Sequence, residues 1–98
     1  MARFDVHEME EGPLVVVCQS ALLDHLDVRF AMPLVAPQLA PAAAGRLNPV
    51  IDVNGKELIA FPQWSSGIPV VALGRKIANV DAQSLTILGA FDFLISGF

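Results

Sequence analysis

The sequence predicts a mainly β fold: five to seven short strands forming a small barrel or a strongly bent sheet, followed by one α-helix near the C-terminus. Three observations support this fold class. Short runs alternate between apolar and polar residues, Gly, Pro and Asn separate these runs, and helical spacing of apolar residues occurs only after residue 81. A length of 98 residues fits one domain, residues 1–98.

The first two strands are predicted to form a hairpin. Residues 4–8 alternate as a half-buried strand does, and residues 15–18 are a β-branched run, with the acidic turn 8–13 between them. The loop that follows is expected to expose three apolar side chains: Leu22, Leu23 and Leu26.

A third strand is predicted over residues 28–35, because apolar and other residues alternate strictly there. Its apolar residues share one face: Val28, Phe30, Met32 and Leu34. Pro33 has no N–H to donate, so the strand should lie at an edge or bend at this point. Residues 36–45 contain two prolines and several alanines, and we expect a one-turn helix or an ordered loop there.

The strongest local prediction is a hairpin of residues 48–53 and 56–61. Asn54 and Gly55 between them tolerate the positive φ angles of a type I′ turn. After a break at residues 63–67, residues 68–73 are predicted to be a mostly buried strand. Residues 74–76 are predicted to be a turn.

The C-terminal helix is predicted from about residue 82 to 95, with Asp81 as its N-cap. One stripe of the helix is expected to face the core or a dimer partner: Ile87, Phe91 and Leu94. A second line is either a contact surface or a solvated face: Leu85, Gly89, Asp92 and Ser96. The apolar segment 93–98 is expected either to pack against protein or to be displayed for recognition.

The composition predicts a protein partner and disfavours nucleic acid as the main ligand. Hydrophobic residues make up 54% of the chain and charged residues only 16%, so a homodimer or an obligate partner should cover part of the surface. The net charge is −4, and the six cations form no dense patch: Arg3, Arg29, Arg46, Lys56, Arg75 and Lys76.

Cysteine usage and the N-terminal residues suggest a cytoplasmic protein without a membrane segment. Cys18 is the only cysteine, so it has no internal disulfide partner, and we expect it to be a small buried apolar side chain. The N-terminal residues lack the apolar run of a secretory signal. The segment 82–98 is shorter than a membrane span and contains Asp92.

No set of residues predicts catalysis, a metal or a cofactor. His7 and His25 lack partners at metal-site spacing, and the chain has neither a glycine-rich phosphate loop nor a nucleophile elbow. The residues alone therefore predict a small soluble β-rich domain that is not an enzyme.

The order of several stretches resembles the CcdB toxins of bacterial toxin–antitoxin modules. These stretches span nearly the whole chain: residues 17–24 (VCQSALLD), 28–34 (VRFAMPL), 47–53 (LNPVIDV), 67–74 (GIPVVALG) and 96–98 (SGF). The resemblance implies an SH3-like barrel with a C-terminal helix, assembled as a homodimer. It also implies a poison that grips the A subunit of DNA gyrase and traps the enzyme on cleaved DNA. The implied partner is a CcdA-like antitoxin whose flexible C-terminal tail neutralises the toxin and which alone would contact DNA.

The resemblance assigns the gyrase contact to six residues: Leu22, Leu23, Asp92, Ser96, Gly97 and Phe98. Two of them differ from the best-known family member, which has Asn in place of Asp92 and Trp in place of Ser96. Loss of the Trp removes aromatic contact area, although Phe98 offers an aromatic ring two positions later. The charge of Asp92 favours a basic patch on the target.

Two other functions compete with gyrase poisoning. A related toxin family shares the barrel and cleaves mRNA, which requires a base and a cation at the scissile phosphate. The candidates for that chemistry are Arg29 with Asp52 or His25, although no spacing singles them out. The third function is a binding module that is no longer toxic, for which the Asp92 and Ser96 differences are the motive.

Overall fold

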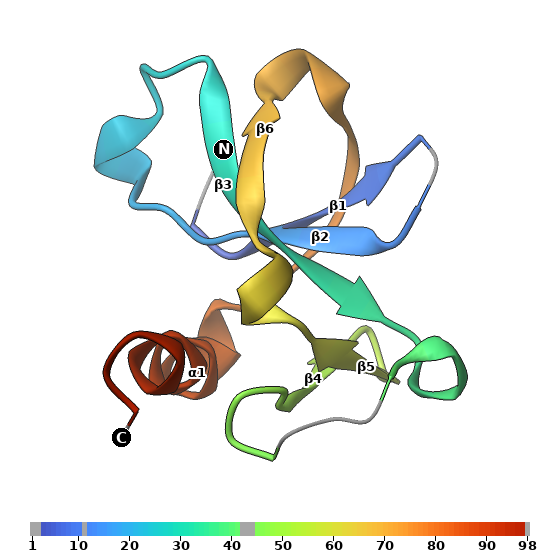
Figure 1. Ribbon diagram of the computed structural model, residues 1–98. Coiled ribbons are helices and arrows are strands. Elements are labelled where there is room, and N and C mark those ends of the chain that lie inside the picture. Colours follow the sequence, from blue (N-terminus) through green and yellow to red (C-terminus); the bar gives the residue numbers. More distant parts are fainter. Residues whose placement is uncertain (1–2, 11, 42–44, 98) are drawn as a thin grey trace.

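The structure is a computed structural model that describes residues 3–10, 12–41 and 45–97. Its strands are β1 (Asp5–Met9), β2 (Leu14–Val17), β3 (Val28–Val35), β4 (Val50–Val53), β5 (Lys56–Ala60), β6 (Ser66–Pro69) and β7 (Leu73–Asn79). They form one curled sheet in the order β4-β5-β3-β2-β1-β7, and β6 pairs separately with β3 (Figure 1). The helix α1 (Ser84–Ser96) follows β7. The predicted small β-barrel with a C-terminal helix is therefore confirmed, while the homodimer stays a prediction.

The first hairpin forms as predicted. β1 and β2 are antiparallel, with Val6 opposite Val16 and His7 opposite Val15. Val6 and Val16 are fully buried, because these β-branched side chains lie on the inward face of the two strands. Glu11, in the turn, lies outside the described residues.

Pro33 marks a change of partner along β3. The strand pairs with β2 on one side, whereas on the other side it pairs first with β6 and then with β5. The carbonyl oxygen of Pro33 accepts a hydrogen bond from the N–H of Phe61 at 3.1 Å, beyond the end of β5. A residue's N and O point to the same side of a strand, so the missing N–H falls where β6 has ended. β3 is therefore a central strand at Pro33, and the expected edge position was wrong.

The apolar face of β3 is buried only in its second half. Met32 and Leu34 are fully buried, but Val28 and Phe30 are about 40% exposed. In the first half the opposite face is buried instead, and it carries Arg29. The exposed half of this face leaves apolar surface that the protomer itself does not cover.

The second hairpin also forms as predicted. β4 and β5 are antiparallel, with Val53 opposite Lys56. Asn54 and Gly55 have φ angles of +53° and +85°, which is the backbone of a type I′ turn. The carboxylate of Asp52 accepts the Gly55 N–H at 2.8 Å and so reinforces the turn.

The prediction for residues 68–76 was wrong. β6 ends at Pro69, a 3₁₀ turn η4 (Val70–Ala72) follows, and Val71 in this turn is 95% exposed. The predicted turn at residues 74–76 lies within β7, which pairs with β1. Gly74 serves close packing rather than a turn, because a Cβ there would collide with the backbone carbonyl of Glu8.

Two other short turns occur where loops were expected. The 3₁₀ turn η1 (Ala21–Leu23) follows β2, and η2 (Pro37–Leu39) confirms the expected one-turn helix after β3. The part of that loop at residues 42–44 lies outside the described residues.

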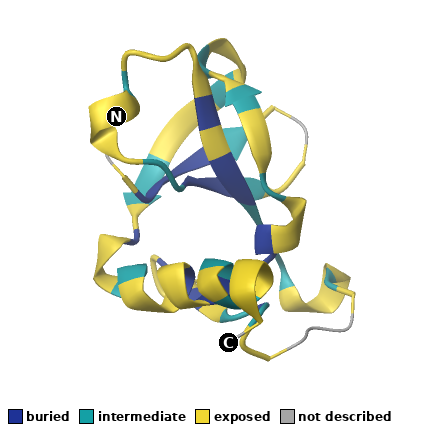
Figure 2. Ribbon diagram, turned by 60° about the vertical axis from the view of Figure 1, so that its left-hand side comes forward, coloured by how far each residue is buried: buried dark blue, intermediate teal, exposed yellow. Residues whose placement is uncertain are grey.

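The helix begins later than predicted. A 3₁₀ turn η5 (Asp81–Gln83) precedes α1, and the N-cap position is Gln83, whose side chain makes no capping bond. Asp81 is therefore not the N-cap, and its carboxylate instead pairs with Arg3 at 3.2 Å. The helix buries Ile87 and Ala90 against the core (Figure 2).

Side chains link the two end strands of the sheet, β4 and β7. The Gln83 side chain donates to the carbonyl of Asp52 at 2.7 Å and accepts its N–H at 2.9 Å. Asn54 donates to the carbonyl of Ile77, in β7, at 3.1 Å. The outer edge of β4 is therefore fastened to the β7–α1 region by side-chain amides.

Candidate protein-binding site

The helix α1 presents an apolar face to solvent. Leu85 and Ile95 are 85% and 82% exposed, and Leu88 is also exposed. Their spacing of three and seven residues places them on one side, opposite the buried Ile87 and Ala90. We call this side the outer face of α1, comprising Leu85, Leu88, Gly89, Asp92, Ile95 and Ser96.

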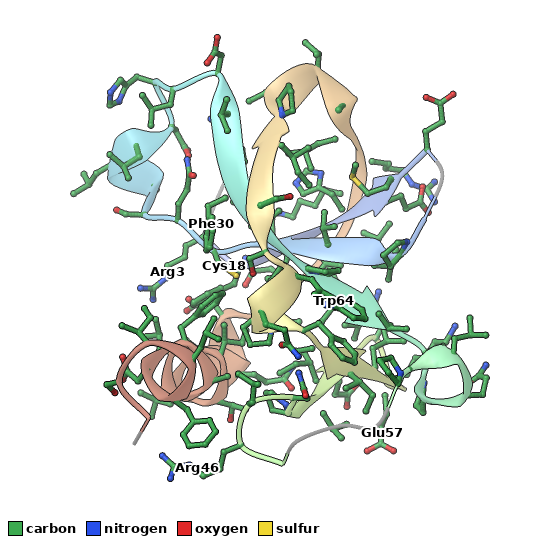
Figure 3. All side chains as sticks on the ribbon, in the orientation of Figure 1. Arg3, Cys18, Phe30, Arg46, Glu57 and Trp64 are labelled. Atoms are coloured by element: carbon green, nitrogen blue, oxygen red, sulfur yellow. The ribbon has the colours of Figure 1, made fainter. Side chains whose placement is uncertain are left out.

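Aromatic side chains fix α1 against the rest of the molecule. The rings of Phe91 and Phe30 lie 5.7 Å apart between centroids, so α1 packs against β3. The guanidinium of Arg46 lies 4.9 Å from the centroid of the Phe93 ring near the end of the helix (Figure 3). These contacts hold the outer face in one orientation.

The predicted core stripe runs from the interior to the surface. Ile87 is fully buried, Phe91 is half-buried and Leu94 is exposed. Within one protomer Leu94 is therefore available to a partner, whereas Ile87 is not.

The predicted contact residues on the helix lie together at its end. Asp92 and Ser96 are exposed, and the Ser96 hydroxyl donates to the carbonyl of Asp92 at 2.6 Å. Gly97 has a φ angle of +79° and donates its N–H to Phe93, which ends the helix in a left-handed cap. Phe98 lies outside the described residues.

The predicted pair Leu22 and Leu23 lies in η1 and is exposed, Leu22 at 87%. The Ser20 hydroxyl accepts the Leu22 N–H at 3.1 Å and starts the turn. This local hydrogen bond stabilises a turn in which both leucine side chains are exposed to solvent.

Arg29 supports this loop from below. Its side chain is almost fully buried, and its guanidinium donates to the carbonyls of Asp24 (2.9 Å), Val28 (3.2 Å) and Leu26. Its Nε lies 3.8 Å from the Asp24 carboxylate, which is an ion pair without a hydrogen bond. The sequence had suggested Arg29 only as a catalytic cation. Its place between Val28 and Phe30 in an alternating strand, however, puts it on the other face of that strand, and this face is the buried one.

The structure does not bring η1 next to α1. In Figures 1 and 2 the η1 loop lies at one end of the molecule and the helix at the other. The η1 turn and the outer face of α1 are therefore separate apolar surfaces of one protomer.

Two of the three candidate ribonuclease residues, Arg29 and Asp52, have structural roles. Arg29 is bound to loop carbonyls, and Asp52 accepts the Gly55 N–H in the hairpin turn. His25 is exposed beside Asp24 in the loop. Arg29 and Asp52 thus belong to different hydrogen-bond networks, and no shared site forms from them.

A comparison with protein-family models settles the family. The model described as "CcdB protein" matches residues 3–97. The chain belongs to the CcdB family. Its members are CcdB-type toxins of toxin–antitoxin modules, as the sequence resemblance predicted. A search of curated proteins found no significant match.

Solved structures share the fold of this CcdB-family chain. One is an endoribonuclease in complex with its cognate antitoxin from a mycobacterial species, with a TM-score of 0.78 and 12% identity, covering 94% of this chain and 91% of the other. Another is an Mtb toxin, with a TM-score of 0.70 and 18% identity, covering 95% and 99%. At these identities the likeness concerns the fold alone.

Cys18 in this CcdB-family protein is half-buried and packs against the core. Burial raises the pKa of its thiol to about 12, so the thiol is protonated at neutral pH and is not a nucleophile. This agrees with the expectation of a small apolar residue.

A buried polar cluster between β1 and β7 was not predicted from the sequence. Asp5 is buried and its carboxylate lies 3.3 Å from the Lys76 Nζ and 2.9 Å from the Asn79 amide. His7 is also buried, and its Nδ1 lies 2.9 Å from the Gly74 carbonyl. The alternation had predicted only that the strand is half-buried.

Neither a metal site nor a membrane helix is found in the described part of the chain. Within residues 3–10, 12–41 and 45–97, no three His, Cys, Asp or Glu side chains are grouped to hold a metal ion. Across the same ranges, no helix has both the length and the apolar character needed to cross a bilayer.

Proposed function

We propose that this protein is a type II toxin that binds the A subunit of DNA gyrase and traps the complex with cleaved DNA. Membership of the CcdB family supports the toxin function. The observation that carries the gyrase proposal is the exposed apolar face of α1, which continues into Ser96 and Gly97. The resemblance assigns the gyrase contact to this end of the helix.

The proposed toxin acts as a homodimer. Exposed apolar side chains on β3 and η4 leave surface that a second copy can cover: Val28, Phe30 and Val71. The η1 and α1 surfaces lie apart in one protomer. A two-fold interface can place η1 of one protomer beside the helix of its partner and so bring Leu22 and Leu23 close to Asp92 and Ser96.

The proposed antitoxin is CcdA-like, with a flexible C-terminal tail, and DNA contact belongs to it alone. Among the described cations, four are engaged in ion pairs: Arg3, Arg29, Arg75 and Lys76. With a net charge of −4, few charges remain to neutralise phosphates.

Binding, not catalysis, is the proposed mode of action. Gyrase poisoning needs no acid, base or metal from the toxin, because it only stabilises a state that gyrase itself forms. The structural roles of Arg29 and Asp52 support this view.

The direct test incubates the purified protein with gyrase, ATP and supercoiled plasmid. We expect linear DNA to accumulate after denaturation of the protein. Absence of linear DNA at toxin concentrations in excess of gyrase would contradict the proposal.

Variants locate the contact. Removal of residues 96–98 should leave a folded dimer that no longer arrests growth. Leu22→Asp should also abolish growth arrest by removing a predicted contact, and it should leave the fold intact because Leu22 is 87% exposed. A matched control is Leu39→Asp, which also changes an exposed leucine but lies in η2. Growth arrest by the truncated protein would show that the helix end is not the contact.

An mRNA endonuclease is the second candidate function, favoured by the structural match to an endoribonuclease bound to its antitoxin. Against it stand the low identity and the engagement of Arg29 and Asp52 in separate hydrogen-bond networks. Fragmented cellular mRNA during growth arrest would support this candidate, and intact mRNA would dismiss it.

A non-toxic binding module is the third candidate, motivated by Asp92 and Ser96 where the best-known family member has Asn and Trp. Normal growth during strong expression without antitoxin would favour it over both toxins.

A further inference from the structure

A small pocket lies between the first half of α1 and the loop that precedes β4. It is lined by Arg46, Pro49, Leu85, Thr86, Gly89 and Ala90. Its volume of about 230 Å³ suits one inserted side chain, since drug-sized ligands occupy about 300 Å³ or more. Leu85 and Gly89 belong to the outer face of α1, and Asp92 lies one turn beyond Gly89. The pocket therefore adjoins the proposed gyrase contact.

Gly89 leaves the helix side of this pocket open. Among the described residues, no atom lies within 4 Å of the position that a Cβ would take at Gly89, so no contact inside the protomer requires glycine. Glycine in the interior of a helix is also less favourable than alanine. What glycine does provide is access, because without a side chain another molecule can approach the helix backbone closely at this point.

Arg46 supplies a positive charge at the same pocket. Its guanidinium lies 4.9 Å from the centroid of the Phe93 ring, which holds it beside the helix (Figure 3). Asn48 fixes the loop by donating to the Ala60 carbonyl at 3.1 Å and to the Gln63 side chain at 2.9 Å. Arg46 forms no ion pair within the described residues, whereas four of the other cations do. A positioned cation without a carboxylate partner complements an acidic group of another molecule.

We propose that this pocket receives one acidic side chain of the gyrase A subunit, whose carboxylate pairs with Arg46. The proposal rests on the proposed gyrase binding and extends that contact from the end of α1 to its first half. The hydroxyl of Thr86 offers the carboxylate a second hydrogen-bond donor, and the exposed Leu85 packs against the aliphatic part of the inserted side chain. An apolar side chain is disfavoured, because it would cover Arg46 without providing a partner for its charge.

A charge exchange tests the ion pair. Arg46→Glu should weaken binding to the purified gyrase A subunit about tenfold or more, measured by calorimetry, because it sets two like charges together. Arg75→Glu is the control: it changes the net charge equally, but Arg75 pairs with Glu8 at the surface and does not line the pocket, so affinity should change less than about twofold. Among gyrase variants with one surface Asp or Glu changed to Lys, one should bind wild type weakly and restore binding to Arg46→Glu. Equal weakening by the two arginine variants, or no restoring gyrase variant, would overturn the proposal.

Gly89→Ala separates binding from folding. It should raise the temperature of unfolding, because alanine favours the helix. It should also weaken gyrase binding about fivefold or more, because the added methyl group occupies space that the inserted side chain needs. Misfolding cannot explain lower affinity in a more stable protein.

The outcomes distinguish this inference from the proposed function. If wild type does not bind the gyrase A subunit, both fail. If wild type binds and Arg46→Glu and Gly89→Ala bind equally well, the inference alone fails. Light scattering should give the same mass for Arg46→Glu as for wild type. Loss of self-association in this variant would overturn the inference in favour of a second copy of the chain at the pocket.

Discussion

At the scale of single residues, Arg29 shows how a buried charge is stabilised without a catalytic role. Its guanidinium donates to the carbonyls of Asp24 and Leu26, which follow η1, and of Val28 at the start of β3, and it lies near the Asp24 carboxylate. A buried guanidinium needs such partners because desolvation alone is costly. The loop geometry that displays Leu22 therefore depends on a side chain that is itself almost fully buried.

We expect Arg29→Met to lower the free energy of unfolding by about 2 kcal/mol, since three buried carbonyl bonds lose their donor. Urea denaturation measures the change. Arg3→Met is the control, because Arg3 forms an exposed pair with Asp81 and should cost less than about 1 kcal/mol. Equal losses in the two variants would refute the supporting role of Arg29.

The Cys18 thiol should resist alkylation in the folded protein. Its pKa is raised from 9.0 to about 12 by burial, so the reactive thiolate is scarce below pH 9 and increases only as the pH approaches 12. Mass spectrometry after iodoacetamide treatment at pH 8 should show little labelling without urea and rapid labelling in urea. Fast labelling of the folded protein would contradict the burial of this side chain.

At the scale of elements, two glycines should respond in opposite directions to the same change. Gly55→Ala should destabilise the protein by about 1 kcal/mol, because φ is +85° in the β4–β5 turn. Gly89→Ala should stabilise it by about 0.5–1 kcal/mol, because Gly89 lies within α1 and a Cβ there meets no atom. Thermal unfolding compares both with the wild type, and changes of the same sign would contradict this assignment.

Elements set by neighbouring residues could be predicted, and those set by distant contacts could not. The Asn54–Gly55 hairpin and the strand 28–35 follow from local turn chemistry and alternation. Residues 68–73 were assigned to a buried strand because they are apolar, although Val71 is exposed. Residues 74–76 were assigned to a turn because of Gly74, which is required instead by the close approach of the Glu8 backbone. No local pattern contains that long-range contact.

The candidate site was predictable to the same extent. Exposure of Leu22 follows from an apolar pair in a loop, and Asp92 and Ser96 share a helix face by spacing alone. The role of Arg29 depends on the backbone path of residues 24–28, which turns three carbonyls toward its guanidinium. The alternation of residue types does not specify such a path.

At the scale of the whole molecule, the unburied apolar surface predicts self-association. The chain mass is 10.5 kDa, and we expect light scattering to give about twice this value at micromolar concentration. The protein should show the mass of one chain only on strong dilution. A single-chain mass at micromolar concentration would contradict the homodimer. It would also contradict a contact surface formed by η1 of one protomer and the helix of its partner.

The Gln83 side chain has a further consequence for solubility. Its amide occupies the N–H and the carbonyl of Asp52 as a neighbouring peptide group would. The outer edge of β4 therefore cannot accept a strand from another molecule at this position, and fibre growth by strand addition is blocked there. Gln83→Ala would reopen the edge, and thioflavin-positive aggregation that exceeds that of the wild type at equal concentration is the expected sign. The Gln83 side chain thus both links β4 to the segment before the helix and protects the edge of β4 against polymerisation.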